Sequence, residues 1–349
     1  MKVLHIVPGV DDIANGMAVV ARFLAKEQGE AEVDDLNHGI HRIHGSSAEE
    51  VWIHGMWLLK EWLACWRTLR SGKRLVRMPH GSVDPVRLRY HGWKKLLVGP
   101  IERWCLRRCA KIVATCEAEK GWIEKYLGKR CPEIEVIDVK RFFKLVSGGV
   151  ESGGVESGGV GEFGSGGVAK NSQLITHNSQ LHLLYLGRQH PLKGLEYLEE
   201  AIKSLPSVSS VYSVVQKPEL RIVSSAFGEE LEKVWHWCDV LVLPTLSENF
   251  GLVVAEALER GKRVITTDGA PAWGEGLSRV EHVDRVDVSR KERKERKDDS
   301  RVDRVEGGLW SGYEGRLIYL KGYRDGTDEE RVELLKKAID MLKHDGNMV

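Results

Sequence analysis

Residues 239–267 read DVLVLPTLSENFGLVVAEALERGKRVITT and set the fold class of the second half of the chain. The apolar run at 239–243 predicts a buried strand, and the spacing of apolar residues at 251–260 predicts a helix. The apolar run at 263–267 predicts a second strand. Two strands joined by a helix predict a parallel sheet that helices cover on both faces.

The same alternation covers the rest of the chain. In the first half it predicts strands at 2–7, 51–54, 74–78, 111–115 and 135–138, and helices at 17–27, 57–70, 87–108 and 117–126. In the second half it adds strands at 181–186, 220–224 and 316–320, and helices at 194–205, 229–237 and 328–342. We therefore predict an α/β fold with two Rossmann-like domains.

Length and composition indicate a globular protein with more than one domain. The chain has 349 residues, of which 42% are hydrophobic and 30% charged, which excludes a disordered chain. The net charge of +1 gives no general attraction to polyanions, so we expect no nucleic acid partner. The charge is unevenly spread. Residues 1–59 hold nine acids and four bases, a net −5, whereas residues 60–111 hold fourteen bases and three acids, a net +11.

The cysteines and apolar runs indicate the compartment. The six cysteines form no CxxC pair, so we expect buried, reduced thiols. The apolar run at the start of the chain is too short for a signal peptide, and no later run approaches ~18 apolar residues. We therefore expect a cytoplasmic protein that does not span a membrane.

Two segments depart from the α/β pattern. The motif SGGVE fills residues 147–151 and 152–156 and returns as SGGVG at 157–161, and ten of the 22 residues at 147–168 are glycine. So much glycine predicts a flexible linker at 147–180, between an N-terminal domain at 1–146 and a C-terminal domain at 181–349. Interleaved acids and bases predict a disordered, solvated loop at about 280–306.

Ligands of α/β sheets bind at the loops that follow the strands. Arg188 and Lys193 follow the strand at 181–186, and two cations beside a helix N-terminus suit a diphosphate. Their alternative reading is as solvated surface charges. His80 follows the strand at 74–78 and enters a glycine turn, where a lone histidine is either catalytic or structural.

Two carboxylates follow the strand at 239–243. Glu248 and Glu256 are eight residues apart, so at about 100° per residue they would not share one helix face. With Glu248 in the loop and Glu256 inside the helix, both reach a ligand at the mouth of the helix. Glu256 lies in an apolar run, where a carboxylate needs a partner. That partner is a ligand hydroxyl, an arginine or a backbone N–H.

Taken in order, these motifs resemble the retaining, nucleotide-sugar-dependent glycosyltransferases of the GT-B fold, the family 4, group 1-like enzymes with an E-x7-E motif. The resemblance rests on residues 184–188 (LYLGR), 193–194 (KG) and 243–257 (LPTLSENFGLVVAEA). In the first half, residues 54–57 (HGMW) and 79–85 (PHGSVDP) resemble the branch that serves bacterial surface polysaccharides. It implies two Rossmann-like domains that face each other across a cleft.

The resemblance also implies how the donor is bound. Arg188 and Lys193 would hold its diphosphate, Gly16 would let the phosphates approach, and Glu256 would bind the ribose hydroxyls. It implies no metal and no other cofactor, since cationic side chains and helix dipoles stabilise the leaving diphosphate.

The same resemblance implies the catalytic residues. Glu248 would sit against the transferred sugar together with the backbone amides of Asn249, Phe250 and Gly251. His80 would face this sugar from the other domain. Attack by the acceptor hydroxyl on the same face would retain the configuration without a protein nucleophile.

The implied function is hexosyl transfer from a nucleotide sugar to a saccharide or lipid-linked acceptor, in the synthesis of cell-surface polysaccharide or lipopolysaccharide. The chain departs from the family pattern after its first strand, where Asn15-Gly16 replaces two glycines, and at 205–219, where no strand–glycine–helix unit is evident. These departures favour one alternative, a degenerate or non-catalytic sugar-nucleotide-binding scaffold subunit. A second alternative is a GT-B sugar-nucleotide epimerase, which would need more acid/base residues in the cleft than the sequence offers.

Tryptophans gather in the basic segment of the first half. Seven of the eleven lie between residues 52 and 122, and the predicted helices at 57–70 and 87–108 mix them with leucine, lysine and arginine. Most should lie in the core, but this mixture also suits a surface that lies on anionic lipid. We therefore predict peripheral, salt-sensitive binding to the inner face of a membrane.

Overall fold

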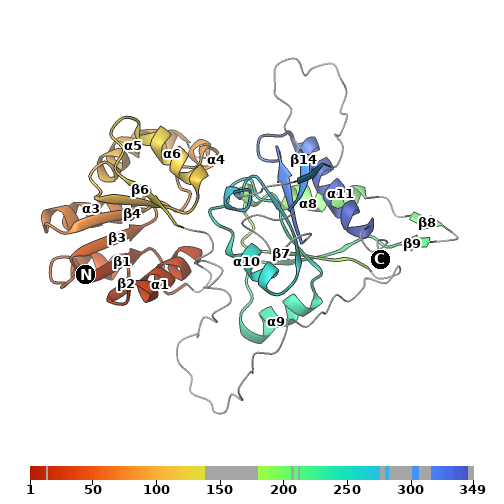
Figure 1. The fold of residues 1–349 in the computed structure, drawn as a ribbon, viewed down its shortest axis with the longest axis horizontal. Coiled ribbons are helices and arrows are strands. Elements are labelled where there is room, and N and C mark those ends of the chain that lie inside the picture. Colours follow the sequence, from red (N-terminus) through yellow and green to blue (C-terminus); the bar gives the residue numbers. More distant parts are fainter. Residues whose placement is uncertain are drawn as a thin grey trace, which may run out of the picture.

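The computed structural model describes residues 1–12, 15–90, 92–137, 180–205, 208–210, 213–275, 280–282, 301–305 and 316–344. These residues form two α/β domains that lie side by side (Figure 1). Most of the predicted linker, residues 147–179, and the middle of the predicted loop, residues 283–300, lie outside the described residues.

The N-terminal domain contains a six-stranded parallel sheet. Its strands, in sheet order, are β2 (Ala31–Asp35), β1 (Val3–Val7), β3 (Glu50–His54), β4 (Arg74–Met78), β5 (Lys111–Ala114) and β6 (Ile134–Val136). Its helices are α1 (Gly16–Gln28), α2 (Leu36–Arg42), α3 (Leu59–Arg70), α4 (Pro85–Arg89), α5 (Gly92–Leu106) and α6 (Glu117–Leu127). The predicted parallel α/β order is confirmed.

Three elements of this domain differ from the prediction. Neither β2 nor α2 was predicted. β2 is an acidic strand at the sheet edge and has no apolar run. The single helix predicted at 87–108 is two helices. Asp84 caps α4 through the Val86 amide, Pro85 takes the first helical position, and the chain leaves α4 in an extended conformation at Tyr90.

The helices of the N-terminal domain form two layers. The helices α2, α3, α5 and α6 pack in series on one face of the sheet, where Leu4, Ile53 and Leu75 are buried. On the other face, α1 packs on β1 and β2. Strands buried on both faces explain the nearly continuous apolar runs that made them recognisable.

The C-terminal domain contains a seven-stranded sheet. Its strands, in sheet order, are β10 (Glu219–Val223), β7 (His182–Leu186), β11 (Val240–Leu243), β12 (Arg263–Thr267), β15 (Leu317–Lys321), β14 (Arg301–Val305) and β13 (Val280–His282). Its helices are η1 (Pro191–Lys193), α8 (Leu195–Ser204), α9 (Gly228–Trp237), α10 (Leu252–Glu259), η2 (Pro271–Trp273) and α11 (Asp328–His344). The first five strands are parallel, with α8 and α11 on one face and α9 and α10 on the other.

Two parts of this domain correct or complete the prediction. The charged stretch at 280–306 is not a loop at its two ends, since β13 and β14 pair antiparallel and β14 continues the sheet from β15. Without β14, the edge of β15 would present unpaired backbone N–H and C=O groups. The charged sequence of β14, which carries valine at intervals, pairs with these groups and extends the sheet. In the region 205–219, β8 (Val208–Ser210) and β9 (Ser213–Val215) form a separate antiparallel pair.

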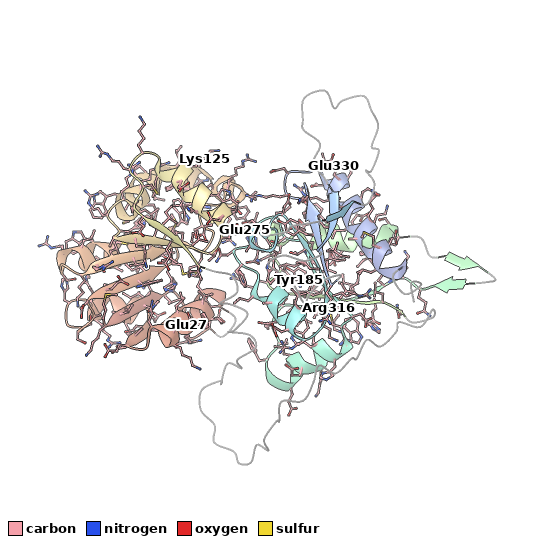
Figure 2. The ribbon with its side chains drawn as sticks, viewed as in Figure 1. Glu27, Lys125, Tyr185, Glu275, Arg316 and Glu330 are labelled. Atoms are coloured by element: carbon pink, nitrogen blue, oxygen red, sulfur yellow. The ribbon has the colours of Figure 1, made fainter. Side chains whose placement is uncertain are left out.

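The topology places the ligand-binding edges. In the first sheet β1 lies between β2 and β3, and in the second sheet β7 lies between β10 and β11, so the strand order reverses at both places. Ligands of α/β sheets bind at such reversals, beyond the carboxyl ends of the strands. The two domains also meet there, as Glu275 at the domain boundary in Figure 2 illustrates, accepting a hydrogen bond from the Ala118 amide at 3.0 Å.

Candidate active site

The loops after β7 and β11 are pressed together by a glycine. Gly194 has a φ of +61°, and a Cβ there would lie 2.1 Å from the backbone oxygen of Pro244, so no other residue fits. This close approach brings Lys193, at the end of η1, into an ion pair with Glu248. Both side chains are largely buried, with 17% and 18% of their surfaces exposed. The structure thus joins two residues that the sequence assigned to different parts of the donor.

The charge on Glu248 is held by its neighbours. Burial would raise the pKa of this carboxyl, but the Lys193 ammonium, its hydrogen bond and the Arg87 guanidinium hold the pKa below its ordinary value. The carboxylate also accepts a hydrogen bond from the backbone N–H of Asn249 at 2.9 Å. Glu248 is therefore ionised at neutral pH, and the backbone N–H of Asn249 already has a partner.

The other two charged candidates lie apart from this pair. The side chain of Arg188 is exposed, and its backbone oxygen accepts the Tyr185 hydroxyl at 2.8 Å. Glu256 lies half-buried within α10, where burial raises its pKa against the opposing charge of Arg260. The diphosphate and ribose contacts of Arg188 and Glu256 stay predictions.

The N-termini of two helices approach each other between the domains. Gly251, with a φ of +72°, precedes α10, and Gly16 begins α1. A Cβ on Gly16 would lie 3.9 Å from the Leu252 side chain, in ordinary van der Waals contact. Phe250 is buried, and its carbonyl accepts the Trp273 indole N–H at 2.5 Å. The positive ends of two helix dipoles therefore lie at the boundary between the domains.

His80 joins this site from the N-terminal domain. It follows β4 with a φ of +53°, a left-handed backbone conformation that residues other than glycine rarely adopt. Its ring is buried, and its Nδ1 lies 3.4 Å from the side-chain nitrogen, Nδ2, of Asn249 in the other domain. Burial, with the nearby Arg87, lowers the pKa of His80 to about 3, so the ring is neutral at pH 7.

A set of contacts across the domain boundary was not predicted. The fully buried Asp84 pairs with Arg324 and accepts the Ser247 hydroxyl at 2.6 Å. Arg87 donates to the same hydroxyl oxygen at 2.9 Å. Thr115 lies 2.7 Å from the side-chain oxygen of Asn249. Asp84 stood within a quoted motif, but no spacing in the sequence indicates a partner 240 residues away.

The remaining site predictions concern the thiols and the membrane. All six cysteines are free, five are buried, and Cys131 is half-buried, which confirms the predicted thiols. None of the helices in the described residues combines the length and apolar character that crossing a bilayer requires.

Comparison with solved structures shows the fold. Sucrose-phosphate synthase from Thermosynechococcus elongatus shares 14% identity with a TM-score of 0.50, over 76% of this chain and 81% of that one. HepE from Anabaena, in complex with UDP and glucose, shares 12% identity with a TM-score of 0.53, over 98% of this chain and 91% of that one. The protein has the GT-B fold of two Rossmann-like domains.

Family comparison gives the class of each half. Residues 40–138 match the family described as Glycosyltransferase Family 4, and residues 180–282 match the family described as Glycosyl transferases group 1. Among curated proteins, no sequence matches this chain. Each half of the protein therefore contains a segment that matches a glycosyltransferase family.

Proposed function

We propose that this protein is a retaining glycosyltransferase that moves a hexose from a nucleotide sugar to a saccharide or lipid-linked acceptor. The observation that carries the proposal is the meeting of His80 from one glycosyltransferase domain with Asn249 and the Lys193–Glu248 pair of the other. The UDP and glucose in the HepE complex make UDP-glucose the first donor to test.

The C-terminal domain supplies the donor contacts. Arg188 and Lys193 hold the diphosphate and Glu256 binds the ribose, while the N-terminus of α10 in the same domain and that of α1 in the N-terminal domain lie at the domain boundary. Fixed cations and helix dipoles stabilise the leaving diphosphate, so the proposed transfer needs no metal. Lys193 would exchange part of its contact with Glu248 for the donor phosphates.

The transferred sugar lies between Glu248 and His80. An ionised carboxylate and a neutral imidazole on opposite sides suit a sugar that gains positive character as its bond to the diphosphate breaks. The acceptor hydroxyl attacks on the face that the diphosphate leaves: the new C–O bond forms as the bond to the diphosphate breaks, the hydroxyl proton passes to the departing diphosphate oxygen, and the configuration at the anomeric carbon is retained. The backbone lines the rest of this space, at Gly16, Asn249, Phe250 and Gly251.

Donor hydrolysis and transfer across a panel of nucleotide sugars test this function. We expect turnover of at least one donor, with the product retaining its anomeric configuration, and we expect turnover to collapse in Glu248→Gln. Binding of a nucleotide sugar without any turnover would instead support the scaffold alternative. The small β8–β9 pair, which stands where the family pattern has a strand–glycine–helix unit, favours that alternative.

We further propose that the acceptor is carried at the inner face of an anionic membrane, as in lipopolysaccharide or surface polysaccharide synthesis. The helices α3 and α5 pack together and expose large apolar side chains: Leu59, Leu63, Trp66, Trp93, Leu96, Leu97, Ile101 and Trp104. Leu59, Leu96 and Leu97 expose 75%, 78% and 70% of their surfaces. We call these eight residues the α3–α5 patch.

Cations accompany the aromatic side chains of the α3–α5 patch. Arg70 lies over the Trp66 ring at 5.0 Å, and Arg108 lies over the Trp104 ring at 4.4 Å. Apolar side chains that alternate with basic ones favour the interface of an anionic bilayer, where each base contributes up to about 1 kcal/mol. The arginines beside the α3–α5 patch therefore favour an anionic lipid surface as its occupant.

Co-sedimentation with vesicles tests this surface. We expect binding to phosphatidylglycerol vesicles at low ionic strength, weaker binding in high salt, and little binding to phosphatidylcholine. Replacing Leu96 and Leu97 together by serine should abolish binding, whereas Phe227→Ser, at an exposed position of the C-terminal domain, should not. Equal binding by both variants would contradict a membrane role for the α3–α5 patch.

A further inference from the structure

A row of buried histidines crosses the N-terminal sheet behind His80. His5 lies in β1, His54 ends β3, and His80 follows β4, and these three strands are neighbours in the sheet. Nδ1 of His5 lies 2.9 Å from Nε2 of His54, and Nδ1 of His54 lies 2.8 Å from Nε2 of His80. The three rings are therefore linked by hydrogen bonds.

An amide stands at each end of this row. Nε2 of His5 lies 2.8 Å from the side-chain oxygen of Gln28, the exposed last residue of α1. At the other end, Nδ1 of His80 faces the amide nitrogen of Asn249, whose oxygen faces Thr115. The row thus connects the surface of α1 to the site between the domains.

All three rings are neutral at pH 7. Burial lowers the pKa of His5 to about 4 and that of His80 to about 3, and it holds the pKa of His54 well below its ordinary value. A neutral imidazole donates through one nitrogen and accepts through the other. Each ring in the row must therefore donate in the same direction as its neighbours.

The direction of the row is fixed by what its ends offer. With the Gln28 oxygen accepting from His5, every ring carries its proton on Nε2, and Nδ1 of His80 is an acceptor toward Asn249. If the end at residue 28 donated instead, His5, His54 and His80 would all move their protons to Nδ1. One end group thus determines the state of a ring three hydrogen bonds away.

We propose that Gln28, through His5 and His54, sets which ring nitrogen of His80 carries the proton. Gln28, His5 and His54 are positioning residues, since they act on the site only through the His80 ring. The left-handed backbone of His80 supports this role, because it aims the ring back along the row while the chain turns away into Gly81. The effect on sugar transfer rests on the proposed function, whereas the effect on the ring does not.

Two substitutions at the exposed end test the proposal. Gln28→Glu offers only acceptors, so His80 should carry its proton on Nε2, as in the wild type. Gln28→Lys offers only donors, so the proton of His80 should move to Nδ1. Long-range nitrogen–proton NMR spectra of protein labelled with ¹⁵N-histidine distinguish the two forms, and the loss of a signal in His80→Gln assigns the ring.

Charge-matched variants control for electrostatics near the same helix end. Lys26→Gln changes the charge as Gln28→Glu does, and Glu30→Gln changes it as Gln28→Lys does, but neither position contacts His5 in the described bonds. Both should keep the wild-type form of His80. The same form of His80 in Gln28→Glu and Gln28→Lys would overturn the proposal.

Kinetics separate this proposal from the proposed function. If His80 acts on the transferred sugar, the two Gln28 variants should differ in kcat by at least about tenfold, with KM changing by less than about twofold. Different ring forms with equal kcat would uphold the role of Gln28 and remove His80 from catalysis. Equal ring forms would overturn the role of Gln28 whatever the activity.

Discussion

The two sheet edges that meet in this protein differ in the charge of the side chains they present. The N-terminal edge presents buried, uncharged imidazoles that are bonded to one another, whereas the C-terminal edge presents an ion pair and an exposed arginine. In the first arrangement, hydrogen bonds fix the orientation of rings that carry no charge. In the second, the side chains stay charged, and a diphosphate could replace Glu248 as a partner of Lys193. In the function we propose, the first edge would orient the sugar and the second would bind its anionic carrier.

Glu248→Gln should break this division most strongly. Removing the carboxylate that faces the developing charge should lower kcat by about 100- to 1,000-fold while donor affinity changes little. Glu256→Gln should act the other way, raising the donor Kd while leaving kcat nearly intact. Steady-state kinetics together with calorimetric donor binding measure both. Identical profiles for the two variants would remove the reason for giving these carboxylates separate roles.

Loss of a cation at the C-terminal edge should have the next largest effect. Each charge-assisted contact to the diphosphate is worth roughly 1.5–3 kcal/mol, so Lys193→Ala and Arg188→Ala should each weaken nucleotide binding by roughly 10- to 150-fold. Lys203→Ala removes an exposed lysine of α8 and serves as the control. Unchanged nucleotide affinity in Lys193→Ala would contradict the diphosphate assignment.

Acid should sharpen the comparison by acting on the N-terminal edge. The pKa values of His5 and His80 are depressed to about 4 and about 3, whereas an unfolded histidine titrates near 6.5. Below about pH 6.5 the unfolded chain therefore binds more protons than the native one. The free energy of unfolding therefore keeps its full value above about pH 6.5. It falls as the pH drops toward the pKa values of the native histidines, by up to about 1.4 kcal/mol per pH unit for each histidine.

Denaturant unfolding at pH 6.5, 5.75 and 5 measures this slope. His5→Gln removes one of the titrating rings, so its free energy of unfolding should fall less steeply with acid than that of the wild type. Parallel slopes for the two proteins would show that His5 does not contribute to the acid sensitivity.

The smallest effect should come from changing the glycine-rich segment at 147–168. Residues 147–168 hold ten glycines and only five apolar side chains, so replacing them by a short Gly-Ser connector should leave Tm and activity nearly unchanged. Differential scanning calorimetry and the transfer assay check this. A large fall in Tm would show that the segment contributes packing that its composition does not suggest.

The sequence predicted those parts of the fold that local patterns determine. β4 and β12 were placed to the residue, because a strand buried on both faces is a short apolar run between polar turns. β2 was missed because its AEVDD sequence is half-exposed at a sheet edge. The same limit explains β13 and β14, which are strands because a neighbour offers an unpaired edge, rather than because their own residues favour it.

The site was predictable one loop at a time and not across the domains. Residues after β4, β7 and β11 could be chosen because ligand sites follow parallel strands. The pairing of Lys193 with Glu248 depends on the close approach at Gly194, and that of Asp84 with Arg324 on the docking of two domains. Such contacts carry no signal in a single sequence, because no periodicity relates their positions.

The contacts of Asp84 and Thr115 bear on how such enzymes diversify. Both belong to the N-terminal domain, yet their side chains fit Ser247, Arg324 and Asn249 of the other. A chimera that took its C-terminal half from a relative would bury Asp84 without a cation unless the incoming half matched it. A stable chimera should therefore carry over both sides of these contacts, so that the exchangeable unit is larger than one domain.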